Sequence, residues 1–233
     1  CVDPSNLGKG HQDPQPNNVC MILPSPCENM FDGQNLNLTY MFRNDFEFDL
    51  LGVDRSTPRS KNEISSFMHN FHVRDPQYYE LFCQLQEGFE KFDIKLTNYG
   101  GNIRGHGADV RYNEGGEEGV GPSGSNFKTL SVRKCAQKYY ESRAVLHLKG
   151  LDWGGGVPAH AQISGTPMIT ITPFLAASNY AKFYNPETGT LACNQAQEIV
   201  DAIFFVVKND EAHAELSKRM LELGNTFFTA EYW

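Results

Sequence analysis

The stretch LHLKGLDWGGGVPAHAQISGTPMITI, residues 146–171, decides the fold. It begins with an apolar run that predicts a buried strand, and three glycines, Gly154 to Gly156, form a turn directly after it. Glycines adopt positive φ without strain and let a ligand come close to the backbone. A helix over 157–164 follows, with its free N–H groups directed at the turn, and a second strand begins at Met168. This order of strand, turn, helix and strand predicts a site that binds an anion such as phosphate.

The segments around this stretch alternate between helix and strand. Helices are predicted over 76–89, 131–140, 195–208 and 211–223, and strands over 19–23, 36–42, 92–97, 144–148 and 168–172. Asp75 and Asn194 are candidate N-caps, and Gly165 ends the helix over 157–164. The alternation predicts an α/β fold, with a Rossmann-like parallel sheet that helices cover on both faces.

The glycine-rich segment from Gly100 to Ser125 predicts a long loop without regular structure. It follows the strand over 92–97, as the Gly154 turn follows the strand over 144–148. Ligands of parallel sheets bind beyond the carboxyl ends of the strands, so we expect both segments to lie on the same rim.

The rest of the chain predicts one domain with a short leader. Residues 1–18 are polar and rich in proline, as in a flexible leader, and 19–233 form the domain. Within it, 44–59 is open between strand and loop. The aromatic tail over 227–233 is expected to dock on the core.

Composition and charge exclude several partners. The chain has 233 residues, 40% of them hydrophobic, which is enough to bury a core. Its net charge of −8 argues against nonspecific binding to nucleic acid or to an anionic bilayer, but leaves open a nucleotide in a neutral pocket. No apolar run approaches the roughly 20 residues of a transmembrane helix, and we expect a soluble, cytoplasmic protein.

The six cysteines contain no C-x-x-C pair, which argues against a zinc site and favours reduced thiols. The sequon at Asn37 fits an ordinary strand better than a glycosylation site. Because the chain begins with Cys1 instead of Met, a fragment or a processed product is one interpretation.

Residues 134–171 resemble the nucleotide-sugar-binding half of GT-B glycosyltransferases, above all the retaining group that includes glycogen and sucrose-phosphate synthases. The resemblance rests on the order of helix, strand, acidic residue, glycine turn, helix and a strand introduced by Gly165-Thr166-Pro167. The later helices and the aromatic end follow in the family's order, so the resemblance covers roughly residues 75–233. It implies one half of a GT-B fold, a nucleoside diphosphate sugar as donor substrate and no separate cofactor.

The resemblance also implies roles for individual residues. The family places two glutamates with seven residues between them, and these positions hold Asp152 and His160 here. Asp152 would lie near the transferred sugar and His160 near the ribose. A neutral imidazole offers only one acceptor nitrogen, whereas a carboxylate offers two oxygens. The family's second half is absent from this chain, so the resemblance further implies an N-terminal partner half on the same or another chain.

Sugar transfer places negative charge on the departing diphosphate, so amides and cations carry much of the work. The amides of Gly155, Gly156 and Val157 are candidates for the distal phosphate, and Lys149 or Arg104 is a candidate to neutralise it. Each has a simpler interpretation: the glycines as a tight turn, Lys149 as a solvated strand end. His106 in the glycine-rich loop is a weaker candidate for the same rim.

Two other enzyme classes lack the necessary pattern. His69 and His72 are three residues apart, but no third metal ligand is placed by the sequence. The nucleophile-elbow pattern of a serine hydrolase is absent from the sequence. Three hypotheses follow: a glycosyltransferase domain with an unknown acceptor, a noncatalytic nucleotide-sugar or interaction module that kept the fold, and a different Rossmann-like nucleotide-binding protein.

Overall fold

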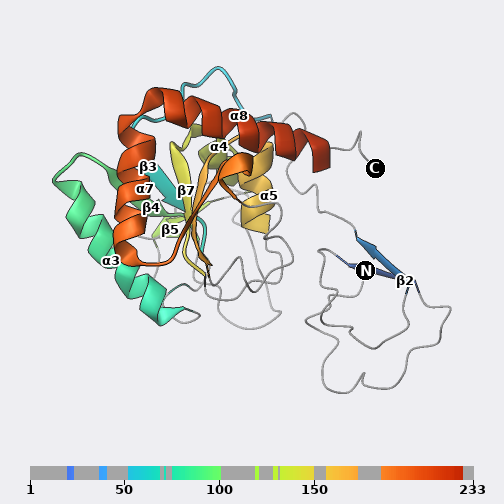
Figure 1. The fold of residues 1–233 in the computed structure, drawn as a ribbon, viewed down its shortest axis with the longest axis horizontal. Coiled ribbons are helices and arrows are strands. Elements are labelled where there is room, and N and C mark those ends of the chain that lie inside the picture. The colour runs from blue at the N-terminus through green and yellow to red at the C-terminus, as the bar shows by residue number, and fades with distance from the viewer. Residues whose placement is uncertain are drawn as a thin grey trace.

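The structure is a computed structural model of the whole chain (Figure 1). It describes residues 20–23, 37–40, 52–68, 71, 75–100, 119–120, 128–130, 132–149, 156–172 and 185–227. The predicted leader over 1–18 and nearly all of the aromatic tail lie outside these residues.

A five-stranded parallel sheet forms the centre of the molecule. Its strands lie in the order β4 (Lys95–Asn98), β3 (Glu63–Ser66), β7 (Ala144–His147), β8 (Met168–Ile171) and β9 (Thr190–Cys193). Strands β7 and β8 are buried at every position, as expected for strands with helices on both faces. The predicted Rossmann-like parallel sheet is confirmed.

Helices cover both faces of this sheet. They are α3 (Pro76–Glu90), α4 (Val132–Glu141), α5 (Gly156–Ile163), α7 (Ala196–Lys208) and α8 (Asp210–Phe227), with a 3-10 helix η4 (Pro186–Thr188) before β9. Phe89 of α3 packs against Phe204 of α7, with ring centroids 5.1 Å apart. Tyr139 of α4 packs against His160 of α5 at 5.4 Å. These contacts pair α3 with α7 and α4 with α5 (Figure 1).

Helix α8 lies across the amino ends of β7, β8 and β9, and Figure 1 shows it running along that side of the sheet. Gly165, just before β8, faces Ser217 and Leu221 of α8, and Gly189, just before β9, faces Met220. Both glycines have positive φ, 62° and 85°. The left-handed conformation ends α5 at Gly165 as predicted, and leaves room for α8.

Two short sheets lie outside the central one. Strands β1 (Cys20–Leu23) and β2 (Asn37–Tyr40) pair in parallel, which confirms the first two predicted strands and places Asn37 in a strand. Strands β5 (Gly119–Val120) and β6 (Lys128–Thr129) pair antiparallel. The prediction that 100–125 holds no regular structure is therefore wrong at Gly119 and Val120.

Some predicted boundaries need correction. The strand predicted over 92–97 begins at Lys95, because the chain first turns through Asp93 at φ 57°. Asp75 precedes α3, but its side chain makes no capping hydrogen bond. The N-cap of α7 is Gln195 rather than Asn194, whose amide instead donates to Glu198. Strands β3 and β9 were not predicted.

Candidate functional site

The candidate site lies at the carboxyl ends of β3 and β7. Among the strands of this sheet, β3 comes first in the sequence. Strand β4 lies on one side of β3, and β7, β8 and β9 follow one another on the other side. The strand order therefore reverses between β3 and β7. In open parallel sheets, ligands bind in the crevice outside such a point.

The connection from β7 to α5 brings part of the predicted phosphate site to this rim. Lys149 follows β7 by two residues and is partly exposed. Gly156 is the first residue of α5, and Val157 is the second. Because β7 and β8 are parallel, α5 must begin at the carboxyl rim in order to return the chain to the amino end of β8.

The first turn of α5 is suited to an anion. It contains no acidic side chain, so nothing of its own charge opposes the positive end of the helix dipole. Pro158 carries no N–H, which leaves the amides of Gly156 and Val157 as the donors among the first three helical residues. Gly154, Gly155 and Asp152 lie outside the described residues, as do Arg104 and His106, and their roles stay predictions.

His160 lies on the second turn of α5 and faces the interior, with 9% of its surface exposed. The ring of Tyr139 meets the imidazole edge-on, at an interplanar angle of 76°. Tyr139 in turn stacks on Phe67, just beyond β3, with centroids 3.7 Å apart. Three rings thus run from the end of β3 through α4 to α5, and they restrict the orientation of the imidazole.

Polar side chains tie neighbouring strand ends together at the rim. Asn98, the last residue of β4, accepts from the amide of Met68 at 2.9 Å and donates to its carbonyl at 3.0 Å. Thr170 of β8 donates to the carbonyl of His147 at 3.0 Å. Thr172 donates to the carbonyl of Cys193 at 3.2 Å. These bonds hold the ends of neighbouring strands together. None of the side chains involved is acidic, and the first turn of α5 contains no acidic residue either.

Two arginines lie at the opposite end of the sheet, Arg143 buried and Arg59 half-buried. Arg59 donates to the carbonyls of Tyr140 and Ser164 and to the hydroxyl of Thr166. Burial lowers the pKa of Arg59 to about 10, so the guanidinium stays charged at neutral pH. Arg143 donates to the carbonyl of Val206 and pairs with Asp210 at 2.7 Å. Through these donated bonds, Arg59 fastens the ends of α4 and α5, and Arg143 fastens α7 and the start of α8.

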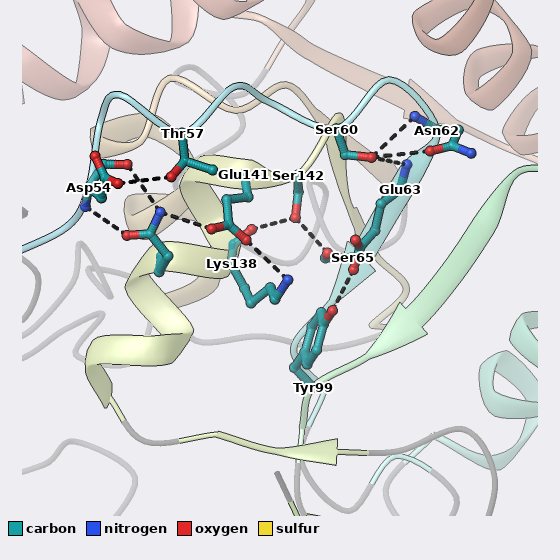
Figure 2. A network of polar contacts seen from close by, with 11 residues as sticks. Asp54, Thr57, Ser60, Asn62, Glu63, Ser65, Tyr99, Lys138, Glu141 and Ser142 are labelled. Atoms are coloured by element: carbon teal, nitrogen blue, oxygen red, sulfur yellow. Dashed lines mark hydrogen bonds and ion pairs between the residues drawn. The ribbon is translucent and has the colours of Figure 1, made fainter. Parts of the chain in front are cut away.

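Figure 2 shows a second polar network, between the segment before β3 and α4. Gln137 accepts from the amide of Asp54 and donates to Glu141, which pairs with Lys138 at 3.0 Å. Tyr99 donates to Glu63 at the other end of the network. The side chains of this network bond one another, so we assign the network a structural role: it positions β3 relative to α4.

Within the described ranges, no group of His, Cys, Asp and Glu side chains is arranged to hold a metal ion. Cys83, Cys135 and Cys193 are free thiols. Burial raises the pKa of Cys135 to about 12 and is the main cause that raises the pKa of Cys193 to about 11, so these two are poor nucleophiles at neutral pH. In the same part of the chain, no helix is both long and apolar enough to cross a bilayer.

Phe67 was not predicted as a rim residue because β3 was not predicted, and Asn98 lies one residue beyond the strand predicted over 92–97. The run from Glu63 to Ser66 alternates poorly, since Ser65 and Ser66 are both buried. Ser65 is accommodated by a hydrogen bond to Ser142, 77 positions later in the chain. The available signal was the short apolar pair Phe67-Met68, which directly follows β3.

Glycosyltransferases are among the solved structures that share this fold. Sucrose-phosphate synthase from Thermosynechococcus elongatus matches 91% of this chain at 18% identity with a TM-score of 0.61, and the chain covers 55% of that protein. The Anabaena protein HepE in complex with UDP matches 89% at 13% identity, with a TM-score of 0.59 and 59% of that protein covered. The C-terminal domain of the group 1 glycosyl transferase LpcC from Francisella tularensis matches 79% at 12% identity, with a TM-score of 0.53 and 95% covered.

The fold is therefore that of the C-terminal, Rossmann-like half of a GT-B glycosyltransferase, as the resemblance implied. The chain spans little more than half of sucrose-phosphate synthase and of HepE, but nearly all of the LpcC domain. Neither a protein-family model nor a curated protein sequence matches this chain. At these identities the likeness establishes the fold, and activity has to be argued from the site.

Proposed function

We propose that this chain is the donor-binding domain of a retaining GT-B glycosyltransferase, which binds a nucleoside diphosphate sugar and transfers the sugar to an acceptor. The observation that carries the proposal is the start of α5. A helix N-terminus without acidic residues lies at the reversal point of the strand order, and a run of glycines precedes it. The fold supports the same conclusion.

The diphosphate would lie against the amides of Gly154 to Val157. As the bond between sugar and phosphate breaks, negative charge grows on the phosphate oxygens, and fixed N–H donors stabilise that charge without reorganising. Lys149, and Arg104 from the glycine-rich segment, would supply positive charge. No metal ion is needed for this step if amides and cations together balance the leaving group.

The sugar and the ribose would contact two further residues. Asp152 would orient the transferred sugar, with one methylene less reach than the glutamate of the family. His160 would lie beside the ribose, where its neutral ring can offer one donor and one acceptor. The contact of His160 with Tyr139, which stacks on Phe67, restricts the orientation of the imidazole and supports this role.

Calorimetry with the full chain tests donor binding, with UDP, GDP and ADP as probes. UDP comes first because HepE was solved in complex with it. We expect Gly155→Val to abolish binding, because a branched side chain blocks the approach of phosphate to the backbone, and His160→Ala to weaken it several-fold. Gly88→Ala is the matched control: that glycine lies in α3 with nothing within 4 Å of an added Cβ. Equal affinity of Gly155→Val and wild type would reject the phosphate assignment.

A noncatalytic module is the second candidate, and the residue at position 160 favours it. An imidazole there replaces a carboxylate that the resemblance implies for donor binding. Turnover of a donor sugar, measured with and without an added N-terminal half, separates the two functions. Nucleotide binding without turnover in either case would establish the module, and no binding to any of the three nucleotides would reject both the enzyme and a different nucleotide-binding protein.

A further inference from the structure

Helix α7 presents a stripe of exposed residues on the side away from the sheet. Its buried face consists of Ile199, Ala202, Ile203 and Val206. Asp201, Phe205 and Lys208 are exposed at positions i, i+4 and i+7, so they share one side of the helix. Phe205 keeps 45% of its surface exposed, which is unusual for a phenylalanine in a described helix of this chain.

The apolar part of this stripe continues onto the turn between α3 and β4. Phe92, in that turn, is 48% exposed and meets Phe204 edge-on with centroids 5.1 Å apart. Leu221 is the third large hydrophobic side chain that the described residues expose, and it lies on α8. Two of the three thus gather at α7, and we call Phe92, Asp201, Phe204, Phe205 and Lys208 the α7 stripe.

The charges of the α7 stripe complement those of a second copy that lies antiparallel to it. Asp201 precedes Phe204 by three residues, and Lys208 follows Phe205 by three. When two α7 helices are laid antiparallel about a twofold axis between Phe204 and Phe205, each Asp201 faces the Lys208 of the other copy. Lys208 makes no ion pair within the part of the chain that the structure describes, and Asp201 accepts a hydrogen bond from Gln197. Both charges are available at the surface.

We propose that the α7 stripe is a twofold contact between two copies of this chain. A closed isologous contact needs a surface that complements itself. The α7 segment that begins with Asp201, continues through Phe204 and Phe205 and ends with Lys208 has this property when paired antiparallel. Because α7 covers a face of the sheet, the carboxyl rim of each copy stays accessible.

The contact is small, so the dimer is expected to be weak. One helix face with a neighbouring aromatic ring buries well below the roughly 800 Å² per partner of a standard interface. We therefore expect association in the micromolar to millimolar range. The exposed ion pairs set the orientation more than the affinity.

Sedimentation velocity of the full chain over a range of concentrations tests this proposal. Wild type should move from monomer towards dimer as its concentration rises, and Phe205→Ser should weaken dimerisation by at least about tenfold. Leu221→Ser is the matched control, since it removes an exposed hydrophobic residue outside the α7 stripe, and it should leave the dissociation constant unchanged. The circular dichroism spectrum of each variant checks that the fold is retained.

Charge reversal tests the antiparallel geometry independently of Phe205. Asp201→Lys alone places lysine opposite lysine, and Lys208→Asp alone places aspartate opposite aspartate, so each variant should dimerise several-fold more weakly than wild type. An equimolar mixture of the two variants restores both opposite-charge pairs and should form the mixed dimer. The double variant D201K/K208D restores both opposite-charge pairs as well, and should dimerise about as strongly as wild type.

Three outcomes would overturn the proposal. The first is a wild-type chain that sediments as a monomer up to about 1 mM, including a chain that instead binds vesicles or another macromolecule through this surface. The second is a dimer that Phe205→Ser leaves intact. The third is failure of the mixed charge variants to recover, which would exclude the antiparallel pairing. The outcome does not depend on whether the chain binds a nucleotide.

Discussion

The two ends of the central sheet differ in how their polar groups are used. At the amino ends of the strands, the side chains of Arg59, Arg143 and His213 bond backbone carbonyls, and these bonds tie down α4, α5, α7 and α8. At the carboxyl ends, the described polar side chains bridge neighbouring strands, while α5 begins with amides and no acidic residue. The side chains at the amino ends form hydrogen bonds that stabilise the fold, whereas the start of α5 at the carboxyl ends offers backbone donors to a ligand.

This difference predicts that variants at the two ends separate stability from nucleotide binding. Changes at the amino ends should lower the free energy of unfolding and leave nucleotide affinity of the folded protein unchanged. Changes at the start of α5 should lower the nucleotide affinity and leave the free energy of unfolding unchanged. Three perturbations at the amino ends of the strands should lower the free energy of unfolding, by decreasing amounts.

The largest effect is expected for Gly189→Ala, between η4 and β9. Gly189 has φ 85°, and an added Cβ would lie 2.5 Å from the carbonyl oxygen of Leu216 and against Met220 of α8. Backbone strain and displacement of α8 together should cost more than about 3 kcal/mol. Urea denaturation measures this loss.

The matched control for Gly189→Ala is Gly88→Ala, inside α3. Here the added methyl group meets nothing within 4 Å, and alanine is the better helix former. We expect a gain of about 0.5–1 kcal/mol. Equal effects of the two substitutions would show that α8 does not pack on the amino ends as described.

Acid should loosen α8 through His213. Its ring donates from Nε2 to the carbonyl oxygen of Arg143 at 2.8 Å. Burial, and after it the charge of Arg143, lower the pKa of His213 from 6.5 to about 4, so the folded protein holds a neutral imidazole. Arg59 lowers this pKa further and Asp210 opposes the shift.

The sign of the pH dependence follows from proton binding. Below pH 6.5 His213 is mostly protonated in the unfolded chain, whereas in the folded chain it stays mostly neutral until about pH 4. Stability from this residue is therefore complete above pH 6.5 and is lost as the pH falls to 4, by about 2 kcal/mol after allowance for solvent screening. Urea denaturation from pH 7 to pH 4.5 measures the slope.

Substitution of His213 by glutamine isolates this residue from the carboxylates that titrate in the same range. Glutamine keeps a donor for the carbonyl of Arg143 and does not titrate. We expect His213→Gln to lose stability less steeply than wild type between pH 6.5 and 4.5. Parallel slopes would assign the acid sensitivity to other groups.

The sequence was sufficient to predict elements whose cause is local. Helix α3 follows from the 3.6 period of Phe82, Leu85 and Phe89, all buried. Strands β7 and β8 follow from apolar runs next to a glycine turn and Gly165-Thr166-Pro167. The start of α5 could be placed at the rim for the same reason, since neighbouring parallel strands require it.

Elements stabilised by distant residues could not be predicted. Strand β3 contains the buried Ser65, whose hydrogen-bond partner Ser142 follows α4, and β9 is an edge strand of modest hydrophobicity beside α7. The ring series from Phe67 to His160 joins three elements far apart in the sequence. No local pattern reports such contacts, so the orientation of His160 became visible only in the fold.

The smallest of the three effects concerns the buried pair of serines, Ser65 and Ser142, within the network in Figure 2. Ser142 donates its hydroxyl proton to the carbonyl of Lys138, so Ser65 must be the donor in the 2.5 Å bond between the two hydroxyls. Ser142→Ala removes the acceptor of a buried hydroxyl and should cost about 1–2 kcal/mol. Ser65→Ala removes only a donor, because Ser142 keeps its bond to Lys138, and should cost about 0.5–1 kcal/mol. Urea denaturation of both variants measures the order of the two losses, and the reverse order would show that the proton directions assigned here are wrong.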